Sequence, residues 1–367
     1  MLEPDRRKPG LLVLLIFLVF LTVAVLGVFG PGELGVAPVR AQVLPPPAPL
    51  VGPGIAVFFT DPTLDAFRGG PETEMLRAID AARARLDVAA YDLDLWGLRD
   101  ALIAAHRRGV TVRVVVEADA LDRPEVQALI AAGIPLAADR PDGLMHQKFV
   151  VIDRRQVWAG SMNFTLNGAY RNDNNLLALT GPEAAAVYEA EFEEMFVDGL
   201  FGAYSPAGMA TALEVAGPDG RRIPVELLFS PDDGARDRIV ALLEGAQESV
   251  RFMAFSFTSD EIGDALLELA AAGIDVRGVF DESQLRSNTG SEYEWLLGAG
   301  LDVRVDGNPD KLHHKVIIID GEIVITGSYN FSASAETRND ENVVILFDEG
   351  VAEVYLEEWE RVFSIGK

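Results

Sequence analysis

The 367-residue chain contains no cysteine and only four histidines. The absence of cysteine excludes disulfide bonds, thiolate metal sites, a lipid-modified cysteine and a cysteine nucleophile. It leaves open the redox compartment in which the protein works. With so few histidines, a repeated pattern that includes them becomes informative about chemistry.

Positive charge is also scarce. Lys and Arg number 31 against 57 Asp and Glu, which gives a formal net charge of -26. Such a surface repels polyanions on average, so indiscriminate, tight binding of nucleic acid is disfavoured. A local basic pocket can still hold one phosphate group. Hydrophobic residues make up 49% of the chain, which is enough to build packed cores.

The amino-terminal segment has the pattern of an export signal. Arg6, Arg7 and Lys8 precede an uncharged apolar run over residues 11–29. As a helix, this run would reach about 28 Å, close to the hydrocarbon thickness of a bilayer. Basic residues before such a run stay in the cytoplasm. We therefore expect residues 1–30 to form a transmembrane anchor and the rest of the chain to be extracytoplasmic.

A cleaved leader is the alternative at this end of the chain. Val39 and Ala41 offer small residues where a signal peptidase could cut before Gln42, and cleavage there would release a secreted protein. In either case residues 31–54, which include "LPPPAPLVGPG", read as a Pro/Gly-rich linker without a fold of its own.

The remaining chain contains one unit twice. Residues 75–119 and 238–282 both predict the order helix, strand, helix, strand. We therefore expect repeats over 55–199 and 225–367, joined by a link over 200–224. Short apolar strands alternating with amphipathic helices favour an α/β sandwich in each repeat. Two copies of one unit can bring their sites face to face across a pseudo-twofold axis.

The repeated pattern is most complete in the second part of each repeat. "HQKFVVIDRRQVWAGSMN" begins at His146, and "HHKVIIIDGEIVITGSYN" begins at His313. Side chains alternate faces along a strand, so each His shares a face with the Lys two residues later, Lys148 or Lys315. His314 has the opposite parity and is expected to face away, as a strand-edge residue.

Each strand ends in an Asp that points to the other face, and the next strand ends in Gly-Ser-x-Asn. Parity makes Asp153 and Asp320 structural anchors at the turn between the strands. The Ser and Asn residues can lie on one side, where they suit a tetrahedral phosphate together with the Lys ammonium groups. These candidate phosphate-binding residues are Ser161, Asn163, Ser328 and Asn330. Two imidazoles facing one phosphorus allow one to attack while the other protonates the departing oxygen.

These residues resemble the phospholipase D superfamily, whose signature is H-x-K-x4-D followed by G-S-x-N. The resemblance covers both repeats and implies a duplicated α/β sandwich with one shared active site. It also implies a phosphodiesterase that works through a phosphohistidine intermediate, with no metal ion and no cofactor. The residues that it makes catalytic are His146, Lys148, Asp153, His313, Lys315 and Asp320.

The resemblance also implies a residue that orients a catalytic histidine. Family members often place a carboxylate eleven residues past the Asn, and Glu341 fits that position in the second repeat. In the first repeat the position holds Asn174, which departs from the pattern. The family commonly uses the first histidine as nucleophile, so we expect His146 to attack and the two histidines to titrate as a coupled pair.

Several functions remain compatible with the sequence. A phospholipid phosphodiesterase at a membrane surface is favoured, with water as the acceptor. An exported endonuclease of the same superfamily, a cardiolipin or phosphatidyl transferase, and an inactive binding scaffold are the alternatives. A monomer suffices for the doubled site, and the sequence gives no evidence of an obligate protein partner.

Overall fold

The computed structural model describes residues 44–64, 66–140, 143–206, 208 and 210–367. The expected anchor over residues 1–30 and the candidate cleavage site at Ala41 lie outside this range. No helix among the described residues has the length and apolar character needed to cross a membrane.

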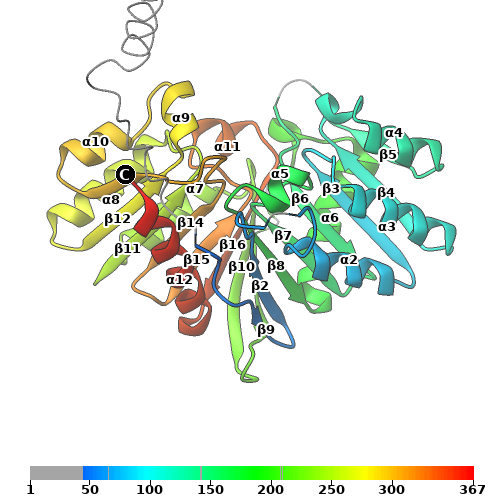
Figure 1. The fold of residues 1–367 in the computed structure, drawn as a ribbon, viewed down its shortest axis with the longest axis horizontal. Coiled ribbons are helices and arrows are strands. Elements are labelled where there is room, and N and C mark those ends of the chain that lie inside the picture. Colours follow the sequence, from blue (N-terminus) through cyan, green and yellow to red (C-terminus); the bar gives the residue numbers. More distant parts are fainter. Residues whose placement is uncertain (1–43, 65, 141–142, 207, 209) are drawn as a thin grey trace, which may run out of the picture. The chain divides into compact units, whose positions relative to one another are not determined.

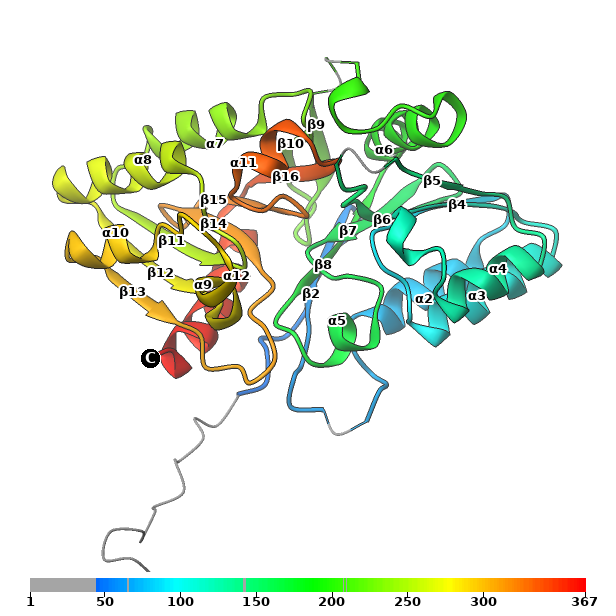
Figure 2. The same cartoon turned by 90° about the horizontal axis from the view of Figure 1, so that it is seen from above.

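Two eight-stranded mixed sheets form the framework, one in each half (Figures 1 and 2). The first sheet has the order β1-β2-β8-β7-β6-β3-β4-β5, and the second has the order β13-β12-β11-β14-β15-β16-β10-β9. When the strand order of the second sheet is reversed, it aligns with that of the first sheet, and β2 corresponds to β10, β6 to β14 and β8 to β16. The predicted duplicated α/β fold is therefore confirmed.

The strands of the first sheet are β1 (Leu50–Val51), β2 (Ile55–Phe59), β3 (Arg85–Ala90), β4 (Thr111–Val116), β5 (Leu136–Ala138), β6 (Lys148–Ile152), β7 (Gln156–Gly160) and β8 (Asn175–Thr180). Those of the second sheet are β9 (Thr211–Ala216), β10 (Arg222–Ser230), β11 (Ser249–Ala254), β12 (Asp275–Phe280), β13 (Asp302–Val305), β14 (Lys315–Ile319), β15 (Ile323–Gly327) and β16 (Glu341–Phe347).

The helices of the first half are α2 (Glu72–Ala81), α3 (Trp96–Arg107), α4 (Pro124–Ala131), α5 (Leu166–Tyr170) and α6 (Pro182–Glu193). Those of the second half are α7 (Ala235–Leu243), α8 (Asp260–Ala271), α9 (Glu282–Ser287), α10 (Tyr293–Gly298), α11 (Ala333–Thr337) and α12 (Glu349–Ile365). Short 3-10 turns cover Ala118–Ala120 and Gly202–Tyr204, and a π-helical turn covers Glu194–Asp198.

The two expected linkers are more ordered than predicted. Residues 50–51 form β1, which pairs with β2, so residues 44–54 do carry structure. The expected link over 200–224 contains β9 and the start of β10, which pair with each other. Alternating apolar residues such as Leu213 and Val215 give this segment the period of a strand, and the partner strand satisfies its backbone.

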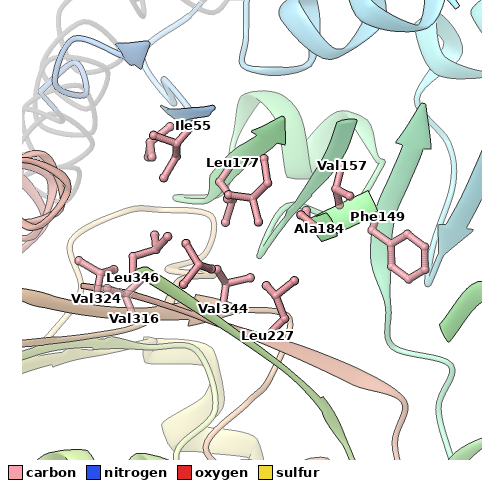
Figure 3. Close-up of a cluster of buried hydrophobic side chains, with 14 of the residues drawn as sticks. Ile55, Phe149, Val157, Leu177, Ala184, Leu227, Val316, Val324, Val344 and Leu346 are labelled. Atoms are coloured by element: carbon pink, nitrogen blue, oxygen red, sulfur yellow. The ribbon is translucent and has the colours of Figure 1, made fainter. Parts of the chain in front are cut away.

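The inner faces of the two sheets share one hydrophobic core (Figure 3). Val157 and Leu177 from the first half and Val344 and Leu346 from the second are all buried in it. The helices α6 and α12 contribute Tyr188 and Tyr355 to the same core. Separate cores on the outer faces hold the remaining helices of each half. The shared inner core fixes the two halves against each other.

Asp153 and Asp320 anchor the turns that follow β6 and β14. Asp153 accepts hydrogen bonds from the backbone N–H groups of Arg83, Ala84 and Arg85, at 2.7–2.9 Å. Asp320 accepts the equivalent three bonds from residues 247–249, each at 2.8 Å. Although burial opposes the charged form, these donors hold the pKa of both carboxyls below its usual range.

Replacing Asp153 with Ala is expected to lower the free energy of unfolding by about 2 kcal/mol, because three charge-assisted hydrogen bonds are lost. A depressed pKa means that the contribution is present at neutral pH and is lost as the pH falls through the folded-state pKa. Urea unfolding at neutral and acidic pH measures both effects. The exposed Asp122→Ala is the control, and equal stability of the two variants would contradict the anchoring role.

Candidate active site

His146 and His313 lie two residues before the strands β6 and β14. The backbone of each histidine pairs with a residue of the other half. The backbone N–H of His146 donates to the carbonyl of Asp340 at 3.0 Å, and that of His313 donates to the carbonyl of Asp173 at 2.9 Å. Each of these Asp residues directly precedes a residue expected to orient a histidine. The crossed backbone pairing therefore brings each orienting residue to the histidine of the opposite half.

Glu341 and Asn174 each hold the histidine of the other repeat. The Oε2 atom of Glu341 lies 2.6 Å from His146 Nδ1. His313 Nδ1 lies 2.8 Å from Asn174 Oδ1 and 3.0 Å from the carbonyl oxygen of Ser161. Because all these partners are acceptors, Nδ1 carries the proton in both rings, which leaves Nε2 for chemistry.

The two serines support these orienting residues. Ser328 Oγ donates to Glu341 Oε2 at 2.7 Å, and Ser161 Oγ donates to Asn174 Oδ1 at 3.0 Å. Both serines are fully buried. In this arrangement the hydroxyl proton of each serine is directed to a neighbouring side chain, and phosphate binding by Ser161 and Ser328 stays a prediction.

The lysines lie on buried strand positions beside their histidines. Lys148 Nζ donates to the carbonyl of His146, and Lys315 Nζ donates to that of His313 at 2.8 Å. Each ammonium therefore keeps hydrogen-bond donors for a further acceptor. The side-chain amides of Asn163 and Asn330 form no hydrogen bond to another described residue, so the Nδ2 group of each can still donate to an acceptor.

Aromatic rings cover the histidine and lysine of each half. The ring centroids of Tyr91 and His146 are 4.6 Å apart, as are those of Phe255 and His313. Lys148 Nζ lies 4.9 Å from the Tyr91 ring, and Lys315 Nζ lies 4.8 Å from the Phe255 ring. The sequence shows these aromatic residues at equivalent positions, but it does not reveal this contact.

The glycine of each Gly-Ser-x-Asn sequence is required by a close backbone approach. A Cβ atom at Gly327 would lie 2.2 Å from the carbonyl oxygen of Asn342, and one at Gly160 would lie 2.5 Å from that of Asn175. Both glycines also have positive φ angles, +136° and +152°. The glycines thus let the serines reach the residues that orient the histidines.

Burial and mutual repulsion lower the pKa values of the basic groups. Burial lowers the pKa of His146 to about 4, although Glu341 opposes this shift. Burial lowers the pKa of Lys148 to about 7. The pKa values of His313 and Lys315 fall well below their usual ranges because of burial and neighbouring cations, which for both include Lys148. The His146 ring also contributes to the lowered pKa of His313. The His and Lys side chains of the two halves therefore influence one another electrostatically.

Asp153 and Asp320 do not belong to this site. Each follows the far end of the strand that His146 or His313 precedes, and its carboxylate binds backbone N–H groups. Their assignment as catalytic residues is therefore corrected to that of structural anchors, as the alternation of side chains along the strand predicted.

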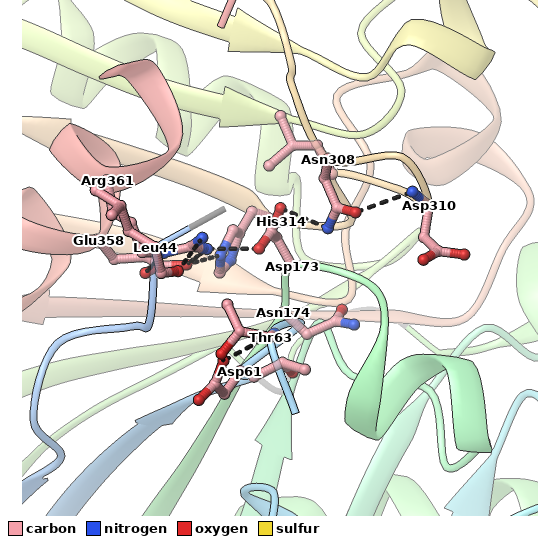
Figure 4. Close-up of polar contacts among 12 residues, drawn as sticks. Leu44, Asp61, Thr63, Asp173, Asn174, Asn308, Asp310, His314, Glu358 and Arg361 are labelled. Atoms are coloured by element: carbon pink, nitrogen blue, oxygen red, sulfur yellow. Dashed lines mark hydrogen bonds and ion pairs between the residues drawn. The ribbon is translucent and has the colours of Figure 1, made fainter. Parts of the chain in front are cut away.

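His314 faces away from the site, as its parity predicted, but it is fully buried and not at a strand edge. Its Nε2 atom lies 3.0 Å from Glu358 Oε1. Arg361 donates to the same glutamate and to Asp173, and these contacts are shown in Figure 4. This network ties α12 to the segment of the first half that pairs with His313.

Known proteins resemble this chain in sequence and in fold. The family described as "Cardiolipin synthase, PLD-like domain" matches residues 75–196 and 239–363. A phospholipase D of Rickettsia typhi is 39% identical over 142 residues, which cover 39% of this chain and 69% of that protein. The human mitochondrial cardiolipin hydrolase is 37% identical over 132 residues, which cover 36% of this chain and 52% of that protein.

A solved structure agrees over both halves. The phosphatidylserine synthase of Haemophilus influenzae has a TM-score of 0.62 at 15% identity and covers 85% of this chain and 87% of its own. At this identity the likeness supports the fold alone. The family matches in both halves, together more than half of the chain, carry the assignment: the chain belongs to the phospholipase D superfamily of phosphodiesterases.

Proposed function

We propose that the protein is a phospholipase D that hydrolyses phospholipids through a covalent phosphohistidine, without a metal ion at the phosphorus. The observation that carries this proposal is the pair of imidazoles, one from each half, each held at Nδ1 by an acceptor from the opposite half. Relatives named phospholipase D and mitochondrial cardiolipin hydrolase support a phospholipid substrate.

The different partners of the two histidines support His146 as the nucleophile. Phosphorylation of Nε2 places a positive charge on the ring, and the Glu341 carboxylate at Nδ1 stabilises that charge. His313 has only neutral acceptors, Asn174 and the Ser161 carbonyl. This arrangement suits a proton donor, because a protonated ring with neutral partners gives up its proton more readily.

The reaction then takes two steps. The bound phosphodiester anion raises the pKa of His313, and this ring then carries a proton at Nε2 as well as at Nδ1. The Nε2 lone pair of His146 forms a bond to phosphorus, the bond to the leaving oxygen breaks, and that oxygen takes the Nε2 proton of His313. In the second step His313 Nε2 takes a proton from water as the water oxygen bonds to phosphorus. The phosphorus–nitrogen bond breaks, its electron pair returns to His146, and phosphatidic acid leaves. Lys148, Lys315, Asn163 and Asn330 hold the phosphate oxygens throughout.

The charge around the site favours a lipid over a nucleic acid. Tyr91, whose ring covers His146, lines a pocket with Asp92, Glu117, Asp119, Ala120 and Arg123. Arg123 pairs with Asp92, so the three carboxyl groups outnumber the one cation. A polynucleotide carries further phosphates on both sides of the one that reacts, and these acidic side chains would repel them. A glycerophospholipid brings one phosphodiester and avoids most of this cost.

We also propose an extracytoplasmic location with a membrane anchor, which would keep the site beside its substrate. The support is the basic and apolar pattern of residues 6–29. Protease digestion of intact and permeabilised cells tests it, because an extracytoplasmic body is digested in both samples.

The substrate class is tested with vesicles and with DNA. The detergent-solubilised full chain is given vesicles of phosphatidylcholine, phosphatidylethanolamine, phosphatidylglycerol or cardiolipin and, separately, single- and double-stranded DNA. We expect phosphatidic acid from at least one vesicle preparation and intact DNA. Cleavage of DNA without lipid turnover would establish the endonuclease alternative, and transfer to an added alcohol in place of water would establish the transferase.

The two histidines are expected to act as one unit. His146→Asn and His313→Asn should each lower turnover at least about 1,000-fold, and the double variant should be little worse than either single variant. With a lipid analogue labelled at phosphorus whose p-nitrophenolate leaving group departs without protonation, His313→Asn should trap label on His146 as an acid-labile adduct, because the second step lacks its base. Label on His313 in the His146→Asn variant would reverse the two roles.

Binding of an anion should draw protons into the site. Lys148 has a pKa of about 7 in the empty site, and a bound anion raises the pKa values of the basic groups around it. Tungstate is a suitable probe because it does not titrate near pH 8. Calorimetry at pH 8 in buffers of different ionisation enthalpy should give an uptake of about one proton per tungstate. Proton release would contradict this electrostatic picture.

A further inference from the structure

The closing helices of the two halves differ at one buried position. In the second half, α12 carries Glu358 and Arg361, which are both buried. The Arg361 guanidinium donates to both Glu358 oxygens at 2.7 Å and also to Asp173 (Figure 4). The positive charge of Arg361 thereby compensates two buried carboxylates.

In the first half the equivalent position is acidic. With the offset of 167 residues that relates the two motifs, Glu358 corresponds to Glu191, Asp173 to Asp340 and Arg361 to Glu194. A carboxylate thus replaces the guanidinium. Asp232 from the loop after β10 joins the group. No Lys or Arg in the described part of the chain forms an ion pair with Glu191, Glu194 or Asp232.

The three carboxylates converge and are incompletely bonded. Glu191, Glu194 and Asp232 each offer one oxygen, and these oxygens lie within 4.8 Å of one another. Glu191 Oε2, Glu194 Oε1 and Asp232 Oδ1 are all buried and have no hydrogen-bond partner among the described residues. Glu191 is 2% exposed and Glu194 is 6% exposed. Oxygens buried this deeply without a partner are costly unless a ligand satisfies them.

The local backbone also differs at this point. α12 runs without interruption from Glu349 to Ile365, past Arg361. α6 ends at Glu193, and Glu194 begins the π-helical turn that ends at Asp198. Single π-helical turns often accompany functional sites because they redirect side chains. Here the turn contains the residue that replaces the arginine.

Burial and mutual repulsion make the empty cluster unfavourable. Burial raises the pKa of Glu191 well above its usual range, and Asp340, Glu194 and Asp232 raise it further. Burial also raises the pKa of Asp232 to about 7. Either protons or a cation must neutralise such a group. A cation among the three carboxylates neutralises them together.

We propose that Glu191, Glu194 and Asp232 bind one Ca²⁺ ion, which supplies the positive charge that Arg361 supplies in the second half. Several carboxylate oxygens without nitrogen or sulfur donors are the ligands that Ca²⁺ prefers, and its flexible geometry accepts a site built from two separate segments. This site is distinct from the active site and does not depend on the proposed reaction.

The site is linked to the strand that His146 precedes. Gln147 Nε2 donates to Glu191 Oε1 at 3.0 Å, and Gln147 Oε1 accepts from Asn342 Nδ2 at 2.7 Å. Asp340, whose carbonyl accepts from His146, contributes to the raised pKa of Glu191. A bound cation would therefore stabilise the junction of the two halves next to the first catalytic histidine.

The test is Ca²⁺ binding by the full chain in detergent after removal of metal with EDTA. Calorimetry should give one Ca²⁺ per chain, and saturating Ca²⁺ should raise the melting temperature by about 3 °C or more. Glu194→Arg should abolish both responses and still fold, because it recreates the arrangement around Arg361. The exposed Glu183→Gln, on the same helix, should bind Ca²⁺ like the wild type.

Two results would overturn the proposal. One is a wild-type chain that takes up no Ca²⁺, which would mean that shared protons neutralise the cluster. The other is undiminished binding by Glu194→Arg, which would place the ion elsewhere. The Arg variant also separates this site from the chemistry. If EDTA inactivates the wild type but not Glu194→Arg, the ion is structural. If EDTA abolishes turnover in both proteins, the reaction itself needs a metal ion, and that result contradicts the metal-free mechanism but not the Ca²⁺ site.

Discussion

The structure depends on an exchange of hydrogen bonds between its two halves. Glu341 of the second repeat holds the imidazole of His146, and Asn174 of the first repeat holds that of His313. All four side chains are buried, so the loss of either bond would leave a polar group without a partner inside the protein. In this structure each histidine is therefore oriented by the opposite repeat.

The exchange also makes a nearly symmetric protein chemically asymmetric. A carboxylate holds one histidine and a carboxamide holds the other, while the contacts of the serines and the lysines are equivalent in the two repeats. A carboxylate stabilises a charged ring and a carboxamide does so less, and the proposed role of His146 as nucleophile rests on this difference. The two repeats also differ at Arg361 in α12 and at Glu194 in the π-helical turn after α6, with opposite consequences for the charge of the buried junction.

The sequence predicted the duplicated α/β fold and the side chains that gather at the site, because strand alternation and repeat spacing are local properties. Parity placed Asp153 on the face away from His146, against the catalytic role that the family signature implies. The sequence did not predict that Ser161 and Ser328 support the orienting residues, nor that the orienting residues cross between halves. Those facts depend on how the two sheets pack, and packing across a shared core has no local signature. The strand β9 within the expected link over residues 200–224 was not predicted, because the Pro and Gly residues on either side of it are typical of a loop.

The central claim is that a single phosphate lies between two imidazoles that come from different repeats. The most direct measurement is a crystal structure of the protein with tungstate bound. The account predicts one tungstate per chain, with its oxygens in contact with the Nε2 atoms of both His146 and His313 and with both lysine ammonium groups. Two separate tungstate ions, one at each His-Lys pair, or one ion that contacts a single histidine, would contradict it.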